Sequence, residues 1–241
     1  MYVTNTLCGG LGNMMFQICA AWAYSRRFGK KLRYSRYICS SHDQNLDLFN
    51  FVTANFIRYN DGTSFVPYLE EGFSYSPLPD IAGNVRLEGY FQSSKYFNDV
   101  ITRRELREKF NSPLKKEKYP FIHIRRGDYL VKDRYHTVLL TEYYESAMSV
   151  IKSDKYYVVS DDMGWVKANF HHDSFIYFDE PAIDCLQLMT SCDSGIIANS
   201  TFSWWGAYLS SSPKMYVAPK NWFGPDGPNN HDLYEKDWVI L

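Results

Sequence analysis

The sequence predicts an α/β fold made of two halves, each with a parallel sheet covered by helices. Two observations predict it. Segments rich in β-formers alternate with segments that carry a helical apolar stripe, and a polar, proline-containing connector lies near the middle of the chain. Alternation of strands and helices implies right-handed crossovers and parallel sheets. The length of 241 residues is enough for two small domains.

The first half reads as a short series of strands and helices. Its expected elements are a strand over 2–7, a glycine turn over 8–13, a helix over 14–28, and strands over 31–35 and 84–90. Gly29 is a stop signal for the helix. Residues 40–84 are rich in Asn, Asp, Gly, Ser and Pro, which predicts loops with short elements.

The connector over 101–120 begins as a charged helix and continues as a polar, proline-containing segment. We place the boundary here, with one half over 1–115 and the other over 116–241. The charges favour a solvated helix face with i,i+4 pairs. The alternative is contact with a membrane surface through the basic cluster over 103–118.

The second half alternates more regularly. Its expected strands lie within 119–126, 155–162, 174–179, 194–200 and 214–219, and its expected helices span 141–152, 163–170, 181–192 and 201–210. Pro181 at the start of the third helix is a helix-start signal. Trp204 and Trp205 fall in an apolar helical stretch, which favours packing over a role as a sugar platform.

Composition limits the function. The net charge is −1, so the chain lacks the positive surplus of a general nucleic-acid binder. Five cysteines at irregular spacing, without a CxxC pair, argue against a disulfide framework or a zinc site. We find neither a signal-peptide pattern nor an apolar run of membrane-spanning length. A cytoplasmic location is therefore expected.

Four polar clusters fall at predicted strand ends, and in parallel sheets such ends share one edge, where ligands bind. The clusters are Gly9–Asn13; His123, Arg125, Arg126 and Asp128; Ser160, Asp161 and Asp162; and Asn199, Ser200 and Thr201. The glycine turn matches neither GxGxxG nor GxxxxGK[ST], which argues against a dinucleotide-dependent reductase or a P-loop. Asn13 is either a helix cap or a side chain aimed at substrate.

Arginine can hold phosphate through two parallel hydrogen bonds. Arg125 and Arg126 are consecutive on an extended segment, so their side chains are expected on opposite faces and in different roles. We expect Arg126 to be the main phosphate ligand and Arg125 to pair with Asp128. Ser200 and Thr201 lie where a helix begins, which suits either an ordinary cap or a phosphate site.

No metal is expected. The two aspartates of "SDD" could hold one, but the chain has no DxD motif, and arginines with a helix N-terminus can neutralise phosphate charge themselves. The alternative for Asp162 is a cap on the following helix. The histidines His123, His136 and His231 do not have metal-ligand spacing, and His171 and His172 are expected on a surface turn.

Taken together, the motifs "GGLGNMMFQ", "HIRRGDY", "SDDMGWVKANF" and "ANSTFSWWGAYL" resemble those of the α-1,2-fucosyltransferases of glycosyltransferase family 11. The resemblance covers nearly the whole chain, and 40–84 is its least specific part. It implies a GT-B-like fold with two Rossmann-type halves facing a cleft. It further implies GDP-β-L-fucose as the donor, held mainly by the C-terminal half, and no metal or other cofactor.

The resemblance and the strand-end clusters together assign roles. Catalysis would involve Arg126, Asn13 and Asp128, although Asp128 paired with arginine would be a poor base. The donor would be bound by Gly10, Gly12, His123, Arg125, Ser160, Asp161, Asp184, Asn199, Ser200, Thr201 and Phe202. The family commonly reads GGLGNQ, whereas Met14 follows Asn13 here, so a glutamine is missing on the acceptor side.

The expected reaction is inverting transfer of L-fucose to the 2-hydroxyl of a galactose-terminated oligosaccharide. The alternatives are a GDP-fucose transferase of another linkage and a non-catalytic GDP-sugar-binding protein. Nucleic acid is not an expected partner. A lipid-linked acceptor would bring the chain into peripheral contact with a membrane.

Overall fold

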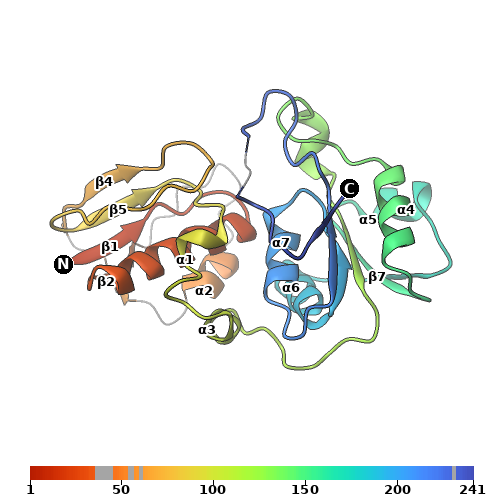
Figure 1. The fold of residues 1–241 in the computed structure, drawn as a ribbon, viewed down its shortest axis with the longest axis horizontal. Helices are drawn as coiled ribbons and strands as arrows, with labels where there is room; N and C mark the ends of the chain where they lie inside the picture. The colour runs from red at the N-terminus through yellow and green to blue at the C-terminus, as the bar shows by residue number, and fades with distance from the viewer. Residues whose placement is uncertain (36–45, 54–56, 60–61, 230–231) are drawn as a thin grey trace. The chain divides into compact units, whose positions relative to one another are not determined.

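The computed structural model describes residues 1–35, 46–53, 57–59, 62–229 and 232–241, which Figure 1 draws as a ribbon. The chain forms two compact units. The first comprises Met1–Phe110 with Asn229–Leu233, and the second comprises Asn111–Pro228 with Tyr234–Leu241. The division thus falls five residues before the predicted boundary, and a short segment from the far end of the chain completes the first unit.

The first unit contains a parallel sheet in the order β3-β2-β1-β5-β4. Its strands are β1 (Tyr2–Asn5), β2 (Lys31–Ser35), β3 (Ile57–Tyr59), β4 (Val66–Leu69) and β5 (Val85–Glu88); its helical elements are α1 (Leu11–Arg27), α2 (Leu46–Thr53), the 3-10 turn η1 (Ser94–Tyr96) and α3 (Arg103–Lys109). The loops with short elements predicted over 40–84 include α2, β3 and β4, and part of that segment lies outside the described residues.

The glycine turn explains where α1 begins. Gly9 adopts a φ of +77°, which glycine reaches without the clash of a Cβ, so the chain reverses there. Gly10 occupies the cap position, and the helix starts at Leu11, three residues before the predicted start. Arg26 and Arg27 lie in the last turn, where the helix dipole favours positive charge.

The second unit contains a parallel sheet in the order β11-β10-β9-β6-β7-β8. Its strands are β6 (Phe121–Ile124), β7 (Tyr156–Ser160), β8 (Phe175–Tyr177), β9 (Ser194–Ile196), β10 (Met215–Ala218) and β11 (Val239–Ile240); its helical elements are the 3-10 turn η2 (Gly127–Val131), α4 (Thr141–Val150), α5 (Met163–Asn169), α6 (Ala182–Ser191) and α7 (Thr201–Tyr208). Every strand and helix predicted here is present, and β11 is an addition.

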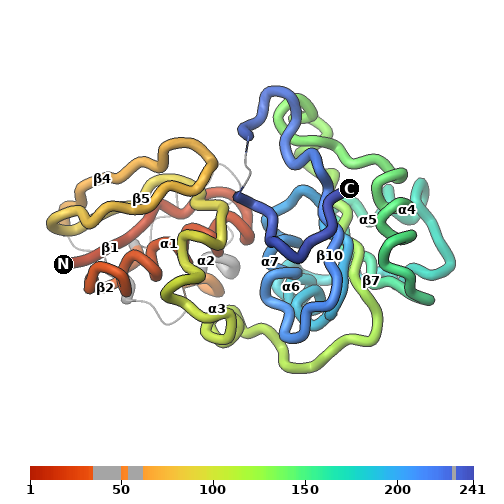
Figure 2. Tube along the Cα trace, in the orientation of Figure 1, coloured from red at the N-terminus to blue at the C-terminus, as the bar shows by residue number. Residues whose placement is uncertain are grey.

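The second sheet is covered on both faces. Helices α4 and α5 lie on one face and α6 and α7 on the other, and the tube in Figure 2 shows α6 and α7 side by side. Ile122 and Ile124 of β6 belong to the core formed with α4 and α5. Strand alternation therefore directs Phe121 and His123 toward α7. Trp204 and Trp205 are fully buried, as the packing prediction requires.

Within the described ranges, no helix is both long enough and apolar enough to cross a bilayer.

Candidate active site

The second sheet has a topological switch point between β6 and β9. From β6 the chain moves outward through β7 to β8, and it then returns to β9 and continues in the other direction to β10. The loops after β6 and β9 consequently lead to opposite faces. In open α/β sheets this is the position at which ligands bind. The predicted arginine and serine–threonine clusters follow these two strands.

Two contacts join the clusters. The hydroxyl of Tyr129, in η2, donates a hydrogen bond to the carbonyl oxygen of Asn199 at 3.0 Å. The ring of His123 meets the ring of Phe202 edge-on, with centroids 5.5 Å apart. Burial raises the pKa of Tyr129 to about 12, so its phenol keeps the proton that it donates. The structure thus brings together the two sequence segments that were predicted to meet.

Arg125 is held by two carboxylates. It forms ion pairs with Asp128, as predicted, and with Asp161, where Nη1 lies 2.7 Å from Oδ2. Its guanidinium also lies over the ring of Tyr129, 5.1 Å from the centroid. A guanidinium carries five N–H donors, so these partners fix its position without using all of its donors.

Arg126 has different partners. Its Nε lies 3.3 Å from the carboxylate of Asp162, and its guanidinium stacks 3.5 Å from the ring centroid of Trp165. Its side chain is 14% exposed, and its backbone N–H donates to Asp161 Oδ1 at 2.9 Å. The expectation that the two arginines separate into different environments is therefore met, although the strand ends before them at Ile124.

The third cluster serves mainly to hold these arginines and α5. Asp161 bonds to both arginines, and Asp162 caps α5 by accepting from the N–H of Trp165 at 3.2 Å. Ser160 Oγ accepts from the N–H of Asp162. Gly127 is needed for this packing, because a Cβ there would lie 2.2 Å from Asp161 Oδ2.

Asp128 lies in a strongly cationic setting. Burial raises its pKa, but Arg125 and Lys132, which both bond to it, outweigh that effect and hold the pKa below its ordinary value. Asp128 therefore stays ionised and is a weak proton acceptor, which agrees with a structural role.

His123 is buried at the end of β6. Desolvation, together with the charge of Arg125, lowers its pKa to about 3, so the imidazole is neutral near pH 7. Its buried Nδ1 atom has no hydrogen-bond partner among the described residues. A buried, unsatisfied ring nitrogen beside the switch point is compatible with the predicted contact to a nucleotide.

The fourth cluster begins α7. Ser200 occupies the cap position, and its hydroxyl accepts from the N–H of Phe202. Thr201 opens the helix, whose first N–H groups lie at the switch point. Asn199 is fully buried, and its Nδ2 donates to the carbonyl oxygens of Thr137 and Trp222, both at 2.8 Å. Asn199 thus holds neighbouring loops through Nδ2, and its contact with the donor stays a prediction.

One predicted residue of the donor site lies apart from the arginines. Asp184 lies exposed in the first turn of α6, and in the described ranges no contact joins it to the arginines.

Among the residues that the structure describes, no three His, Cys, Asp or Glu side chains gather in a way that could hold a metal ion. The absence of a metal stays a prediction.

The first unit has its own switch point, between β1 and β5. Gly10 caps α1 through its backbone, while Gly12 and Asn13 lie within the first turn of the helix. The alternative of Asn13 as a cap is therefore wrong. Asn13 Oδ1 instead accepts a hydrogen bond of 3.0 Å from Nε2 of Gln92, which follows β5.

Tyr129, Trp165 and Gln92 were missed by the sequence analysis. Tyr129 and Gln92 each bond to a residue at least 70 positions away in sequence, so local patterns hold no sign of the pairing. Trp165 lies in the motif "SDDMGWVKANF", but its stacking on Arg126 depends on the way α5 follows β7.

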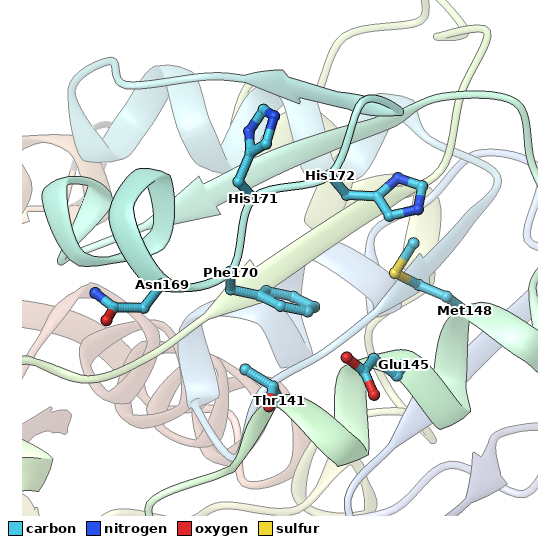
Figure 3. Close-up of a pocket in the computed structure, with 7 residues that line it drawn as sticks. All are labelled: Thr141, Glu145, Met148, Asn169, Phe170, His171 and His172. Carbon is cyan, nitrogen blue, oxygen red and sulfur yellow. The ribbon is translucent and has the colours of Figure 1, made fainter.

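A separate pocket of about 470 Å³ lies against α4 and the loop between α5 and β8 (Figure 3). Its lining consists of Thr141, Glu145, Met148, Asn169, Phe170, His171 and His172. The predicted surface position of His171 and His172 is confirmed, since both are exposed. The residues of the switch-point site do not line this pocket, and it is therefore not part of that site.

Comparison with known proteins gives the same fold and a family. The model of "Glycosyl transferase family 11" matches residues 85–241. The Escherichia coli heptosyltransferase WaaC with ADP superposes with a TM-score of 0.55 at 8% identity, over 100% of this chain and 93% of that one. Together with the two parallel sheets, this likeness confirms the predicted GT-B-like fold class.

Three relatives illustrate the range of similarity. The O-antigen biosynthesis glycosyltransferase WbnK of Escherichia coli is 37% identical over 50% of this chain and 43% of its own length, less than half of that protein. An α-1,2-colitosyltransferase of Escherichia coli is 25% identical over 99% of this chain and 98% of its own length. The galactoside α-(1,2)-fucosyltransferase 2 of Oryctolagus cuniculus is 24% identical over 95% of this chain and 72% of its own length.

Proposed function

The chain belongs to glycosyl transferase family 11, and from this premise we propose that it is an inverting galactoside α-1,2-fucosyltransferase. It transfers L-fucose from GDP-β-L-fucose to the 2-hydroxyl of a terminal galactose on a glycan, without a metal. The rabbit relative named for this activity matches 95% of the chain, which supports the donor and the linkage. A cytoplasmic location and membrane contact through a lipid-linked acceptor stay predictions.

One observation carries the proposal. A fixed guanidinium and the start of α7 follow neighbouring strands at the switch point of the second sheet. Such a pair supplies positive charge and oriented N–H groups to one anion, which suits the diphosphate of a nucleotide sugar. Neutral His123 and the ring of Phe202 lie next to this position and would meet the nucleoside.

The proposed mechanism is electrostatic. As the bond between fucose and phosphate breaks, negative charge grows on the GDP leaving group, and the sugar acquires oxocarbenium character. Donors fixed in advance stabilise that charge without reorganising at the moment of reaction, and one such donor is worth about 3–4 kcal/mol. The acceptor hydroxyl loses its proton late, and Asp128, held ionised by cations, is better suited to positioning Arg125 than to taking this proton.

We propose Arg125 as the stronger phosphate ligand, and its contacts support this choice. It lies over Tyr129, which bonds to the segment that opens α7, whereas Arg126 lies against Trp165 of α5. The sequence analysis preferred Arg126, and that preference stays a prediction. Lysine substitution distinguishes the two, because lysine keeps the charge but loses the forked geometry.

The test compares Arg125→Lys and Arg126→Lys with Arg134→Lys, whose exposed ion pair with Asp226 lies outside the site. We expect Arg125→Lys to lower kcat by roughly 100-fold or more in GDP-fucose turnover, Arg126→Lys to have a smaller effect, and the control to resemble wild type. Thermal unfolding shows whether the variants are equally stable. Near-full activity in both site variants would exclude the proposed phosphate site.

A second candidate is transfer of another GDP-activated deoxysugar. The relative named as an α-1,2-colitosyltransferase matches 99% of the chain, which favours this candidate specifically. Parallel assays with GDP-fucose, GDP-colitose and GDP-mannose, followed by linkage analysis of the product, decide between the donors and the linkages. GDP binding without sugar transfer to any acceptor would instead indicate a non-catalytic binding protein.

A further inference from the structure

The carboxylate of Glu70 contacts the backbone of the loop that follows β5 in the first unit. Glu70 Oε2 accepts hydrogen bonds from the backbone N–H groups of Tyr90 and Phe91, at 2.7 and 2.9 Å. Its Oε1 accepts from the hydroxyl of Tyr96 at 3.1 Å. Gly89 permits the approach, since a Cβ there would lie 2.4 Å from Cβ of Glu70. The carboxylate therefore fixes the backbone of this loop at two consecutive residues.

Phe91 shows how firmly the loop is held. It adopts a φ of +52°, in the left-handed region that a residue with a bulky side chain rarely occupies. Its ring is fully buried and packs edge-on against Tyr96, with centroids 5.3 Å apart. Such a conformation persists only where the surroundings impose it, and it concentrates at functional sites. Here it turns the chain immediately before Gln92.

Gln92 is 6% exposed, and it connects this loop to the glycine turn. Its Nε2 donates to Asn13 Oδ1 at 3.0 Å. On the other side, Asn13 Nδ2 lies against Gly9, where an added Cβ would approach it to 2.5 Å. The two ends of the Asn13 amide thus face different neighbours.

The hydrogen bond between Gln92 and Asn13 concerns the position after Asn13, where the resembled motif GGLGNQ has a glutamine that this chain lacks. Met14 occupies that position, and its side chain is buried. A glutamine amide nevertheless reaches Asn13 from 79 residues away in sequence. The loop after β5 therefore supplies the kind of group that the turn itself lacks.

We infer that Gln92 is a positioning residue that sets the Asn13 amide toward a hydroxyl of the acceptor sugar, and that Glu70 and the left-handed Phe91 hold Gln92 in place for this purpose. The inference rests on the proposed function for the identity of the acceptor. The contact between Gln92 and Asn13 itself does not depend on that identity. Gln92 acts through its N–H donor, which distinguishes positioning from packing.

Gln92→Glu tests this distinction because it keeps the size and shape of the side chain but removes the N–H donor. The Asn13 amide can then donate a hydrogen bond to the carboxylate of the variant only if the amide turns so that Nδ2 faces that carboxylate. We expect kcat/KM for the acceptor to fall about 10–100-fold and the KM for GDP-fucose to change little. Because a carboxylate at this buried position lowers stability, thermal unfolding is measured to show that the variant is folded at the assay temperature. Gln187→Ala, in the second unit, is the matched glutamine control.

A double-mutant cycle identifies the route of the effect. If Gln92 acts through Asn13, then adding Gln92→Glu to Asn13→Ala produces no further loss of transfer. Full additivity of the two losses, or wild-type acceptor kinetics in Gln92→Glu, would overturn the inference.

A measurement without turnover separates this inference from the proposed function. In protein labelled with 15N-asparagine, the side-chain resonances of Asn13, assigned by their loss in Asn13→Ala, should shift in Gln92→Glu and stay in place in Gln187→Ala. Unmoved resonances overturn the inference whether or not transfer occurs. If the resonances shift in Gln92→Glu but the wild-type protein transfers no sugar to any galactoside, the proposed function is refuted, and with it the acceptor role of Gln92.

Discussion

Arg125 and Arg126 are neighbours in the chain, yet they belong to different parts of the second unit. Asp161 is the residue that separates them, because it accepts the backbone N–H of Arg126 and pairs with the side chain of Arg125. The close approach of Asp161 depends in turn on the missing Cβ of Gly127. The motif RRGD therefore works as one unit in which the glycine makes room for a carboxylate from the next strand.

His123 leads to a prediction about pH. Its pKa falls from an ordinary value of 6.5 to about 3 on folding, so between these pH values the imidazole is protonated in the unfolded chain and neutral in the folded chain. Stability should therefore decrease as the pH falls from 6.5 toward 3, by at most about 1.4 kcal/mol per pH unit from this group. Urea unfolding of wild type and His123→Gln at pH 7 and pH 5 measures it, and the variant should lack this contribution.

The matched control is His171→Gln, which changes an exposed histidine in the same unit. It should keep the acid sensitivity of wild type. An equal dependence on pH in wild type and in His123→Gln would show that the buried imidazole is not the group responsible.

Local spacing determined which residue contacts could be predicted from the sequence. The pair of Arg125 with Asp128 and the cap formed by Asp162 both join residues three positions apart, a distance that a sequence pattern reveals. The contacts of Tyr129 with Asn199 and of Gln92 with Asn13 join distant residues. These depend on strand order, and a single sequence gives no access to them.

Among the elements, α3 shows how a short charged helix is stabilised at its start. Thr102 and Glu105 form a reciprocal capping box, and Glu105 also pairs with Arg26 of α1 at 2.7 Å. The hydrogen bond from Arg26, with those from Thr102, lowers the pKa of Glu105 from 4.5 to about 2. The helix is thus secured by a contact that the charge pattern of 101–120 did not specify.

We predict that Glu105→Ala lowers the free energy of unfolding by about 1 kcal/mol at neutral pH, because it removes both the cap and the ion pair. Since the folded pKa is depressed, the stabilisation by Glu105 is present above pH 4.5 and disappears as the pH falls toward 2. Chemical unfolding at pH 7 and pH 3 should show a smaller difference between variant and wild type at the lower pH.

Glu108→Ala provides the comparison for this helix. Its exposed i,i+4 pair with Arg104 should contribute only about 0.3–0.5 kcal/mol. A cost for Glu108→Ala equal to that for Glu105→Ala would argue against a special role for the capping box.

The strands and helices themselves were largely predictable, because their apolar periods are local. Alternation in β6 predicted that neighbouring residues would separate, and the structure directs Ile122 to one core and His123 to α7. The predicted start of α1 was wrong because all four residues of GGLG were assigned to the turn. In the structure the turn is complete at the left-handed Gly9 and the cap residue Gly10, so Leu11 already belongs to the helix. The two-residue strand β11 is too short to give a period.

At the scale of the whole molecule, each unit repeats one plan: a parallel sheet with a switch point beside its first strand. The plan leaves the two switch points chemically different. Amide side chains such as Asn13 and Gln92 meet in the first unit, and guanidinium and carboxylate groups such as Arg125 and Asp161 meet in the second. Neutral amides suit sugar hydroxyls, whereas the charged groups suit a diphosphate.

Asp232 connects the far end of the chain to the first unit. Its carboxylate accepts from the N–H of Tyr75 at 2.8 Å and pairs with Lys95, and its carbonyl accepts from Ser93. We predict that Asp232→Ala costs about 1–2 kcal/mol and speeds amide exchange over 75–96. Hydrogen exchange followed by mass spectrometry should localise the change there.

Asp226→Ala removes an exposed partner of Arg134 in the second unit and is the control. It should leave exchange over 75–96 at the wild-type rate. Unchanged exchange in Asp232→Ala would mean that the returning segment does not hold this loop.

The return of Asn229–Leu233 also has a consequence for biosynthesis. The 118 residues of 111–228 are translated between the two parts of the first unit. At roughly 5–20 residues per second, Phe110 leaves the peptidyl-transferase centre about 6–24 s before Asn229. During that interval the loop around Ser93 lacks Asp232, so the nascent first unit passes through an incomplete state in the cell, even though most of its sequence is made first.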